Sequence, residues 1–190
     1  MRRRRLLRAA TATAAVGTAA GCLTDGTESD SSGDGDPAGG DPDGEDAVDF
    51  GSDWPSGSYA DYDTTRVTVE SAAGDALGTV RAAIAETPDQ RYLGLSDAAS
   101  LPEDAGMLFV YDAPRESLTF VMREMAFGID IVYADAGGTI TRIHNAAAPG
   151  PAEDGNQQRY PGSGQYVLEV PYEWTDRHGV DAGDALSFEL

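Results

Sequence analysis

From residue 64 to the C-terminus, the chain is a succession of short apolar runs separated by Gly, Pro and Asp turn signals. Runs of this length and character are typical of strands rather than helices. The segment 129–134 is apolar except for Asp130, so we expect it to be a central strand covered on both faces. The predicted strands span residues 65–70, 77–85, 106–111, 117–122, 129–134, 139–145, 165–170 and 185–190.

Two short helices are expected to interrupt this pattern. Thr87 followed by Pro88 is a helix start, because threonine caps free N–H groups and proline suits the first helical position. We expect that helix to end near Gly94, a second helix within residues 172–178, and a long loop at 146–163. Residues 64–190 therefore predict one mainly β domain, a small sandwich or flattened barrel with two short helices.

The first 22 residues carry the signals of protein export. Arg3 and Arg4 precede the Ala- and Thr-rich segment 9–23, which is too short and too weakly apolar to span a membrane as a helix. Cys22 is the only cysteine and follows small residues, as is typical of a lipid-attachment site. We therefore expect residues 1–22 to be a twin-arginine export signal, with Cys22 anchoring the exported protein to the outer face of the cell membrane.

Residues 23–63 are rich in Asp, Gly, Ser and Pro and contain no basic residue. A segment of this composition buries too little apolar surface to offset the entropy of ordering, so we expect a disordered acidic tether. Three aromatic residues, Phe50, Trp54 and Tyr59, mark its end. Two alternatives stay open for them: they dock on the domain, or they are exposed and adhesive.

The chain is strongly acidic. All 13 basic residues are arginine, and 33 acidic residues give a formal net charge of −20. Repulsion among so many acidic groups is screened in molar salt, where the Debye length is about 3 Å. The lack of lysine and the abundance of Asp and Glu resemble a haloarchaeal protein, so we attribute the acidity to life in salt rather than to cation binding. It also argues against nucleic-acid binding, which requires a basic surface.

Six motifs follow one another between residues 91 and 184: Arg91-x-x-Gly94-Leu95, Leu101-Pro102 with Gly106-Met107-Leu108-Phe109-Val110, Phe120-x-Met122-Arg123, Ile129-Asp130-Ile131-Val132, Val167-Leu168-Glu169-Val170, and Gly183-Asp184. On these motifs, residues 65–190 resemble the domain-of-unknown-function 192 family. The resemblance implies a mainly β, jelly-roll-like fold and no particular activity. The chain departs from the usual family pattern in having Ser96 in place of Met, and Val121, Arg123, Glu124 and Met125 in place of Trp, Lys, Asn and Thr.

Asp130 is the polar residue that the predicted sheet would bury. A buried carboxylate has to be paired or has to change its protonation state, and Arg91 and Arg123 are the candidate partners. Two interpretations stay open: a buried ion pair that fixes the register of the sheet, or a polar cluster at the mouth of a β pocket. In the second, the candidate ligand-binding residues are Arg91, Met122, Arg123 and Asp130, and two guanidinium groups would suit a carboxylate or phosphate.

The sequence contains no nucleophile elbow, paired CxxC, HExxH or phosphate-binding loop. The candidates for catalysis are a carboxylate pair of Glu124 and Asp130, and His144. His144 and His178 are too far apart in the sequence to suggest a metal site, and His178 suits a helix C-terminus. We therefore expect no metal ligands and no cofactor.

Together these features favour a lipid-anchored cell-surface domain that binds a small polar ligand or an envelope protein without catalysis. Two alternatives stay open. One is a hydrolase that acts on polar surface substrates through a carboxylate pair, and the other is an accessory protein in envelope assembly or stability.

Overall fold

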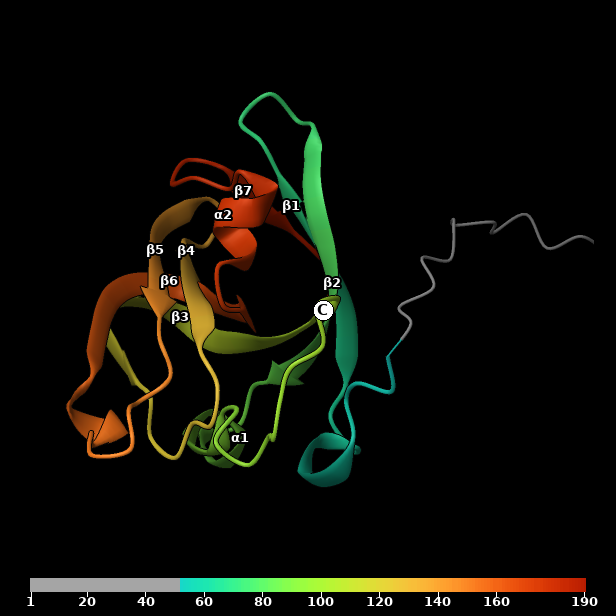
Figure 1. Ribbon diagram of the computed structural model, residues 1–190. Helices are drawn as coiled ribbons and strands as arrows, with labels where there is room; N and C mark the ends of the chain where they lie inside the picture. Colours follow the sequence, from blue (N-terminus) through green and yellow to red (C-terminus); the bar gives the residue numbers. More distant parts are fainter. Residues whose placement is uncertain (1–51) are drawn as a thin grey trace, which may run out of the picture. The chain divides into compact units, whose positions relative to one another are not determined.

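The structure, a computed structural model, describes residues 52–190. These residues form one seven-stranded sheet with two short α-helices (Figure 1), which confirms the prediction of a mainly β domain. The expected export signal with Arg3, Arg4 and Cys22, and most of the expected tether, lie outside the described residues. The elements in chain order are η1 (Gly57–Tyr59), β1 (Thr64–Glu70), β2 (Ala76–Ala85), α1 (Pro88–Leu93), β3 (Ala105–Val121), β4 (Ile129–Ala134), β5 (Ile140–Ala146), η2 (Gly155–Gln157), β6 (Arg159–Pro171), α2 (Trp174–His178) and β7 (Ala185–Ser187).

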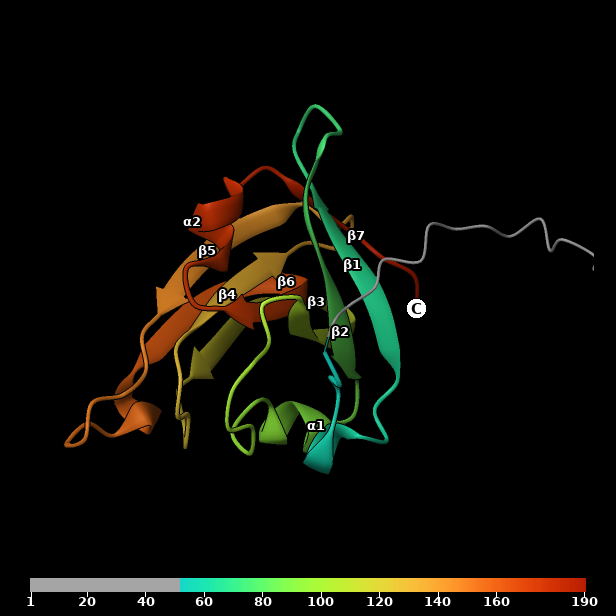
Figure 2. The same cartoon turned by 45° about the vertical axis from the view of Figure 1, so that its right-hand side comes forward.

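The sheet has the order β5-β4-β6-β3-β2-β1-β7, and every neighbouring pair is antiparallel except β2 and β3. A parallel pair needs a crossover connection, which α1 and the loop after it provide. The sheet also curls until its two end strands meet: Ile140 N donates to Asp184 O at 2.7 Å, and Leu186 N donates to Gly138 O at 2.8 Å. In both views α1 and α2 lie at opposite ends of the curled sheet (Figures 1 and 2).

Both faces of the sheet are covered at β4 and at residues 105–109 of β3 and 167–170 of β6, and alternate residues there serve two separate cores. One face carries the pocket-side core, which also includes residues before β1 and after α1. The opposite face carries the α2-side core. The pocket-side core contains Trp54, Tyr59, Ala83, Ala85, Leu95, Ala105, Met107, Phe109, Met122, Ile129, Ile131, Tyr133, Ala146 and Val167. The α2-side core contains Val67, Val69, Val80, Ala82, Leu108, Val132, Ala134, Ile140, Leu168, Val170, Trp174, Val180 and Leu186.

The structure corrects two predicted boundaries. The strands expected at 106–111 and 117–122 are one strand, β3, whose pairing with β6 shifts register around Arg115. Residues 112–116, which separate the two predicted strands, are the exposed middle of this bent strand. The expected loop at 146–163 ends at residue 158, because β6 already begins at Arg159. Gly162 suggested a loop, yet it lies in β6, where an added Cβ would approach the Tyr133 ring to 2.6 Å.

Trp54 and Tyr59 dock on the domain, which is the first of the two alternatives left open, while Phe50 lies outside the described residues. The Trp54 side chain is 5% exposed, and its Nε1 donates to Gly106 O at 2.9 Å. The Tyr59 hydroxyl accepts a hydrogen bond from Asp97 N at 3.1 Å, and its ring lies 5.1 Å from that of Trp54. The folded unit therefore begins before residue 64. Within residues 52–190, no helix has the length and apolar character that crossing a membrane would require.

Candidate ligand pocket

A pocket of about 330 Å³ opens between α1 and the face of the sheet that carries the pocket-side core. It is walled by α1 and the loop after it, by both halves of β3, and by the loop after β3, while β4, η2 and β6 each contribute one residue. The lining residues are Arg91, Tyr92, Leu93, Gly94, Leu95, Ser96, Phe109, Tyr111, Thr119, Phe120, Val121, Arg123, Met125, Ile129, Asn156 and Glu169.

Local sequence signals position α1 beside this pocket. Gln90 N donates to Thr87 Oγ1 at 3.2 Å and Thr87 N donates to Gln90 Oε1 at 3.0 Å, so the two residues form a capping box. Gly94 ends the helix with φ 51° and ψ −137°, a conformation that only glycine adopts easily. The predicted start and end of this helix are confirmed, and Arg91 lies in its last turn, facing the pocket.

Glu169 is the acidic residue of the pocket lining. It lies on β6 between Met107 of β3 and Ile131 of β4, and therefore belongs to the face that carries the pocket-side core. Its side chain is 5% exposed, and Oε2 accepts no hydrogen bond from any residue in 52–190. Burial raises the pKa of this carboxyl to about 8, because the charged form has lost its water without gaining a partner. The group is therefore a neutral acid at pH 7 when the pocket holds no ligand.

Arg123 brings a guanidinium group to the same pocket from the loop after β3. Its Nη2 donates to Tyr92 O at 2.5 Å and to Ser96 Oγ at 3.1 Å, and its guanidinium carbon lies 3.9 Å from the centre of the Tyr92 ring. Its Nε is buried and donates no hydrogen bond within residues 52–190; Glu124 Oε2 lies 3.9 Å away. Arg123 is thus fixed in place while one N–H has no acceptor.

Arg91 supplies a second guanidinium group. Its Nη1 donates to Val110 O at 2.9 Å and also to Glu86 O, which ties the end of α1 to β3. The guanidinium carbon lies 5.0 Å from the centre of the Tyr111 ring. Burial raises the pKa of the Tyr111 hydroxyl, and among nearby charges Arg91 lowers it while Glu169 raises it. One phenol ring is therefore within electrostatic reach of both the cation and the acid.

Apolar and aromatic side chains complete the walls. Phe109 and Phe120 meet edge to face with their ring centres 4.9 Å apart, an arrangement favoured by the charge distribution of aromatic rings. Asn156 reaches the pocket because Gly155 lies directly against the backbone of Met122, where an added Cβ would be 2.0 Å from Met122 O. The cavity thus combines an apolar body with a few polar groups, as is usual for small-molecule sites.

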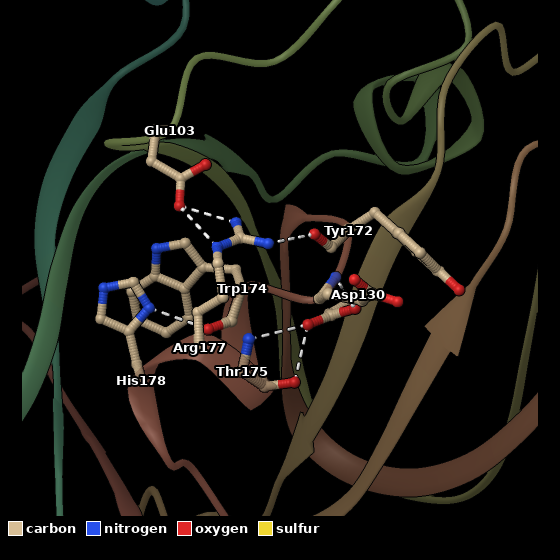
Figure 3. Close-up of polar contacts among 8 residues, drawn as sticks. Glu103, Asp130, Tyr172, Trp174, Thr175, Arg177 and His178 are labelled. Carbon is tan, nitrogen blue, oxygen red and sulfur yellow. Dashed lines mark hydrogen bonds and ion pairs between the residues drawn. The ribbon is translucent and has the colours of Figure 1, made fainter.

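Asp130 lies outside this pocket, on the face of β4 that carries the α2-side core. Its Oδ1 accepts from Glu173 N at 2.9 Å, and its Oδ2 accepts from Thr175 N at 2.8 Å and Thr175 Oγ1 at 2.6 Å (Figure 3). Burial raises the pKa of the Asp130 carboxyl, and these hydrogen bonds oppose the rise. The expected partnership with Arg91 or Arg123 is therefore corrected: the carboxylate holds the start of α2 because its neighbours on that face are backbone N–H groups.

Further contacts hold α2 in place. Arg177 pairs with Glu103 at 2.6 Å and donates to Tyr172 O at 2.7 Å (Figure 3). His178 lies in the last turn, as expected, and its ring stacks on Trp174 with centres 4.0 Å apart. These contacts fix the helix against the sheet, and none of these residues lines the pocket.

The other candidates from the sequence are spread over the fold. Met122 is fully buried in the pocket-side core next to the pocket lining. Glu124 lies in the loop after β3 and points into solvent, with 76% of its side chain exposed. His144 Nε2 lies 2.9 Å from Pro161 O. Within residues 52–190, no three His, Cys, Asp or Glu side chains gather as a metal site would require.

Sequence reasoning missed Glu169 as a site residue. The signal was present, because Glu169 is a lone acidic residue inside the apolar run 167–170, just as Asp130 is within 129–134. The pattern alone does not show which of two such residues meets donors. Four of the five departures from the usual family pattern line the pocket, namely Ser96, Val121, Arg123 and Met125, whereas Glu124 points into solvent.

Two solved structures resemble the chain. A protein from Sinorhizobium meliloti 1021 described as "a putative transcription regulator" is 27% identical with a TM-score of 0.60, covering 67% of this chain and 95% of its own. A protein of unknown function from Novosphingobium aromaticivorans is 25% identical with a TM-score of 0.57, covering 65% of this chain and 84% of its own. No curated protein matches the chain. Residues 68–188 match the family DUF192, described as Uncharacterized ACR, and the chain therefore belongs to this uncharacterised family.

Proposed function

We propose that this protein is a lipid-anchored cell-surface protein whose domain binds a small polar ligand in the pocket between α1 and the sheet. The observation that carries the proposal is that two guanidinium groups and an unpaired buried acid, Arg91, Arg123 and Glu169, line one aromatic-walled cavity. Buried polar groups without partners are rare in folded proteins, and a ligand that supplies the missing partners accounts for them.

The anchoring part of the proposal rests on the sequence of the first 22 residues. Arg3 and Arg4 before an apolar segment, and Cys22 after small residues, support export followed by lipid attachment. Replacing Cys22 with Ser should release the protein from the membrane fraction into the medium. A Cys22→Ser protein that stays with the membrane would contradict the anchor and leave the binding proposal intact.

A second candidate function is acid–base catalysis in the same pocket. Glu169 favours it, because a carboxyl group whose pKa is raised to about 8 by burial is suited to donate a proton near neutral pH. The carboxylate pair of Glu124 and Asp130 receives no such support, since Asp130 binds the start of α2 and Glu124 points into solvent. Ser96, the hydroxyl beside Arg123, already donates to Leu93 O at 2.6 Å and accepts from Arg123, so it is not placed to act as a nucleophile. Glu169 therefore has no nucleophilic hydroxyl of Ser96 to work with, and we favour binding over catalysis.

Transcription regulation, the role in the description of the Sinorhizobium protein, is not part of the proposal. DNA binding draws its affinity from neutralising phosphates with basic side chains. This chain carries a formal net charge of −20, so the negative phosphates of DNA would repel it.

The binding proposal is tested by a thermal-shift screen of the full chain in molar KCl against sugars, carboxylates, amino acids, nucleotides and divalent cations. A ligand at a hundredfold excess over its Kd stabilises the folded state by about 2.7 kcal/mol, which raises Tm by several degrees. We expect a hit that disappears in both Arg123→Gln and Glu169→Gln. It should persist in Arg142→Gln, the matched control, because Arg142 is exposed on β5 and lines no part of the pocket.

Two results of this screen would contradict the binding proposal. A screen in which no compound shifts Tm, or in which Arg142→Gln abolishes the hit as completely as Arg123→Gln, would overturn binding in this pocket. Turnover of a hit compound that is lost in Glu169→Gln would move the assignment to the catalytic alternative.

A further inference from the structure

We propose that the ligand of this pocket is a small zwitterion, an ammonium compound with a carboxylate close by, whose ammonium group meets Glu169 and whose carboxylate meets Arg91 and Arg123. The inference rests on the proposed function, because it names the chemical class that the same pocket would take.

Among the described residues, Glu169 lacks a hydrogen-bond donor for its buried oxygen. Its Oε2 is buried without a hydrogen-bond donor in residues 52–190, because its neighbours on β3 and β4 are the apolar side chains of Met107 and Ile131. Burial raises the pKa of this carboxyl, and no neighbouring cation among residues 52–190 offsets the rise. A ligand that places an N–H donor at this end of the cavity satisfies the oxygen, and a positively charged donor does so most strongly.

The two arginines of the pocket offer N–H donors to a ligand. Arg123 is held by Tyr92 and Ser96 through one nitrogen, and its Nε has no acceptor in the described part of the chain. Arg91 is held by two backbone carbonyls through Nη1 alone. Both guanidinium groups are held in place by contacts that do not use all of their N–H groups. Preorganised guanidinium groups of this kind recognise a carboxylate through two parallel hydrogen bonds.

The cationic and acidic ends of the pocket share one aromatic neighbour. Arg91 lowers the pKa of the Tyr111 hydroxyl and Glu169 raises it, so both groups lie within electrostatic reach of this side chain. A volume of about 330 Å³ is at the small end for ligand sites, which span roughly 300–1,000 Å³. A compact molecule with its opposite charges a few bonds apart fits this layout, and Phe109 and Phe120 provide an apolar wall for its side chain.

The ammonium group should carry hydrogens. A trimethylated ammonium has no N–H to offer, so it would leave the buried Oε2 of Glu169 without a donor. The inferred class is therefore a free amino acid or a compound of the same head group, in preference to a betaine.

The test compares four probes by titration calorimetry on the full chain in molar KCl. They are L-phenylalanine, 3-phenylpropionate without the ammonium, 2-phenylethylamine without the carboxylate, and N,N,N-trimethylphenylalanine without the N–H donors. Glycine, L-leucine and L-glutamine are titrated alongside to vary the side chain. We expect at least one amino acid to bind about tenfold or more tightly than its analogues, since a hydrogen bond to a charged group contributes this much.

Two variants test which residue binds the ammonium group of the ligand and which binds its carboxylate. Glu169→Gln should weaken the amino acid about tenfold or more and leave 3-phenylpropionate unchanged, whereas Arg123→Gln should weaken both. Glu189→Gln, an exposed control, should change neither. In the parent protein at about pH 7, binding of the amino acid should release close to one proton, because an ammonium beside Glu169 favours its ionised form. Titrations in two buffers of different ionisation enthalpy measure that proton, and Glu169→Gln should abolish it.

Three outcomes would overturn the inference. One is an analogue without the ammonium that binds as tightly as the amino acid; another is amino-acid binding that Glu169→Gln leaves unchanged. The third is that no amino acid binds at millimolar concentration while the wider screen finds a different ligand of this pocket, in which case the binding proposal survives and the zwitterion does not. A screen without any hit overturns both.

Discussion

Asp130 and Glu169 are two buried acids on neighbouring strands, and they have opposite surroundings. In the pairing of β4 with β6, Ile131 lies opposite Glu169 and Asp130 lies opposite Val170, so the acids are one register position apart. That single position places them on opposite faces of the sheet. Asp130 accepts three hydrogen bonds from Glu173 and Thr175. Glu169 Oε2 accepts none from residues 52–190.

The difference shows that burial of an acid does not by itself indicate a site. The acid that accepts three hydrogen bonds stabilises the fold, because it satisfies free N–H groups at the start of α2. The acid left unpaired lies on the wall of a cavity, where a ligand can reach it. Counting donors around a buried carboxylate therefore separates a structural role from a binding role more reliably than its exposure does.

The largest expected effect that tests this contrast is the pH dependence conferred by Glu169. Its pKa is about 8 in the folded state against 4.5 for the free group, so between these values the folded state holds one proton more than the unfolded state. Stability contributed by this group is fully present below pH 4.5 and falls as pH rises to about 8, by on the order of 5 kcal/mol. Glu169→Gln should match the parent at low pH and exceed its free energy of unfolding at about pH 9.

Denaturant unfolding at about pH 5 and about pH 9, in one salt concentration, measures this difference. Glu189→Gln removes an exposed carboxylate of the same type and should keep the pH dependence of the parent. Identical pH dependence in the parent and in Glu169→Gln would show that Glu169 is solvated or paired, and the contrast with Asp130 would fail.

Trp54 tests whether the segment before β1 keeps Glu169 buried. It packs against Tyr59, which lies within electrostatic reach of Glu169, and it binds Gly106 on β3. Trp54→Ala should lower the free energy of unfolding by about 4 kcal/mol, as is usual for a buried tryptophan. It should also lower the pKa of Glu169 towards its ordinary value and leave Asp130 unaffected. A loss below about 1 kcal/mol would mean that this segment contributes little to the domain.

Asp130→Asn tests the structural half of the comparison. The amide keeps one acceptor but turns an NH₂ group towards donors, so at least one of the three hydrogen bonds from Glu173 and Thr175 is lost. We expect a loss of about 3 kcal/mol in the free energy of unfolding, with ligand affinity unchanged in the folded protein. Thr175→Val, which removes only the hydroxyl donor, should cost about half as much. Affinity lost in step with Asp130→Asn would place Asp130 in the site after all.

The smallest expected effect concerns Glu124, which follows Arg123 in the loop at the pocket. Its backbone has φ 57°, in the left-handed region that glutamate rarely adopts, and its side chain is 76% exposed. Glu124→Asn should stabilise the protein by up to about 1 kcal/mol, because asparagine tolerates this conformation. Glu116→Asn, at an exposed position of β3, is the control and should not stabilise. Thermal unfolding of the three proteins decides the point.

The sequence predicts the mainly β fold because its alternation and turn signals are local, and the capping box at Thr87 fixes α1 for the same reason. Two separate strands were predicted where β3 is continuous, because only pairing with β6, distant in sequence, shows that residues 112–116 are strand. Arg91 and Arg123 were candidates on the basis of their charge, and the fold brings both to one pocket. Glu169 was missed because the choice between it and Asp130 depends on the position of α2, which no local pattern specifies.

The most direct test of the central claim is a pH titration of the Glu169 side-chain carboxyl by carbon NMR in the full chain. The Glu169→Gln protein identifies the signal by its disappearance. An unpaired acid on the wall of the pocket predicts a midpoint of about 8, moving downwards when an amino acid binds. A midpoint near 4.5, unchanged by any ligand, would contradict the account, because the carboxylate would then be solvated or already paired.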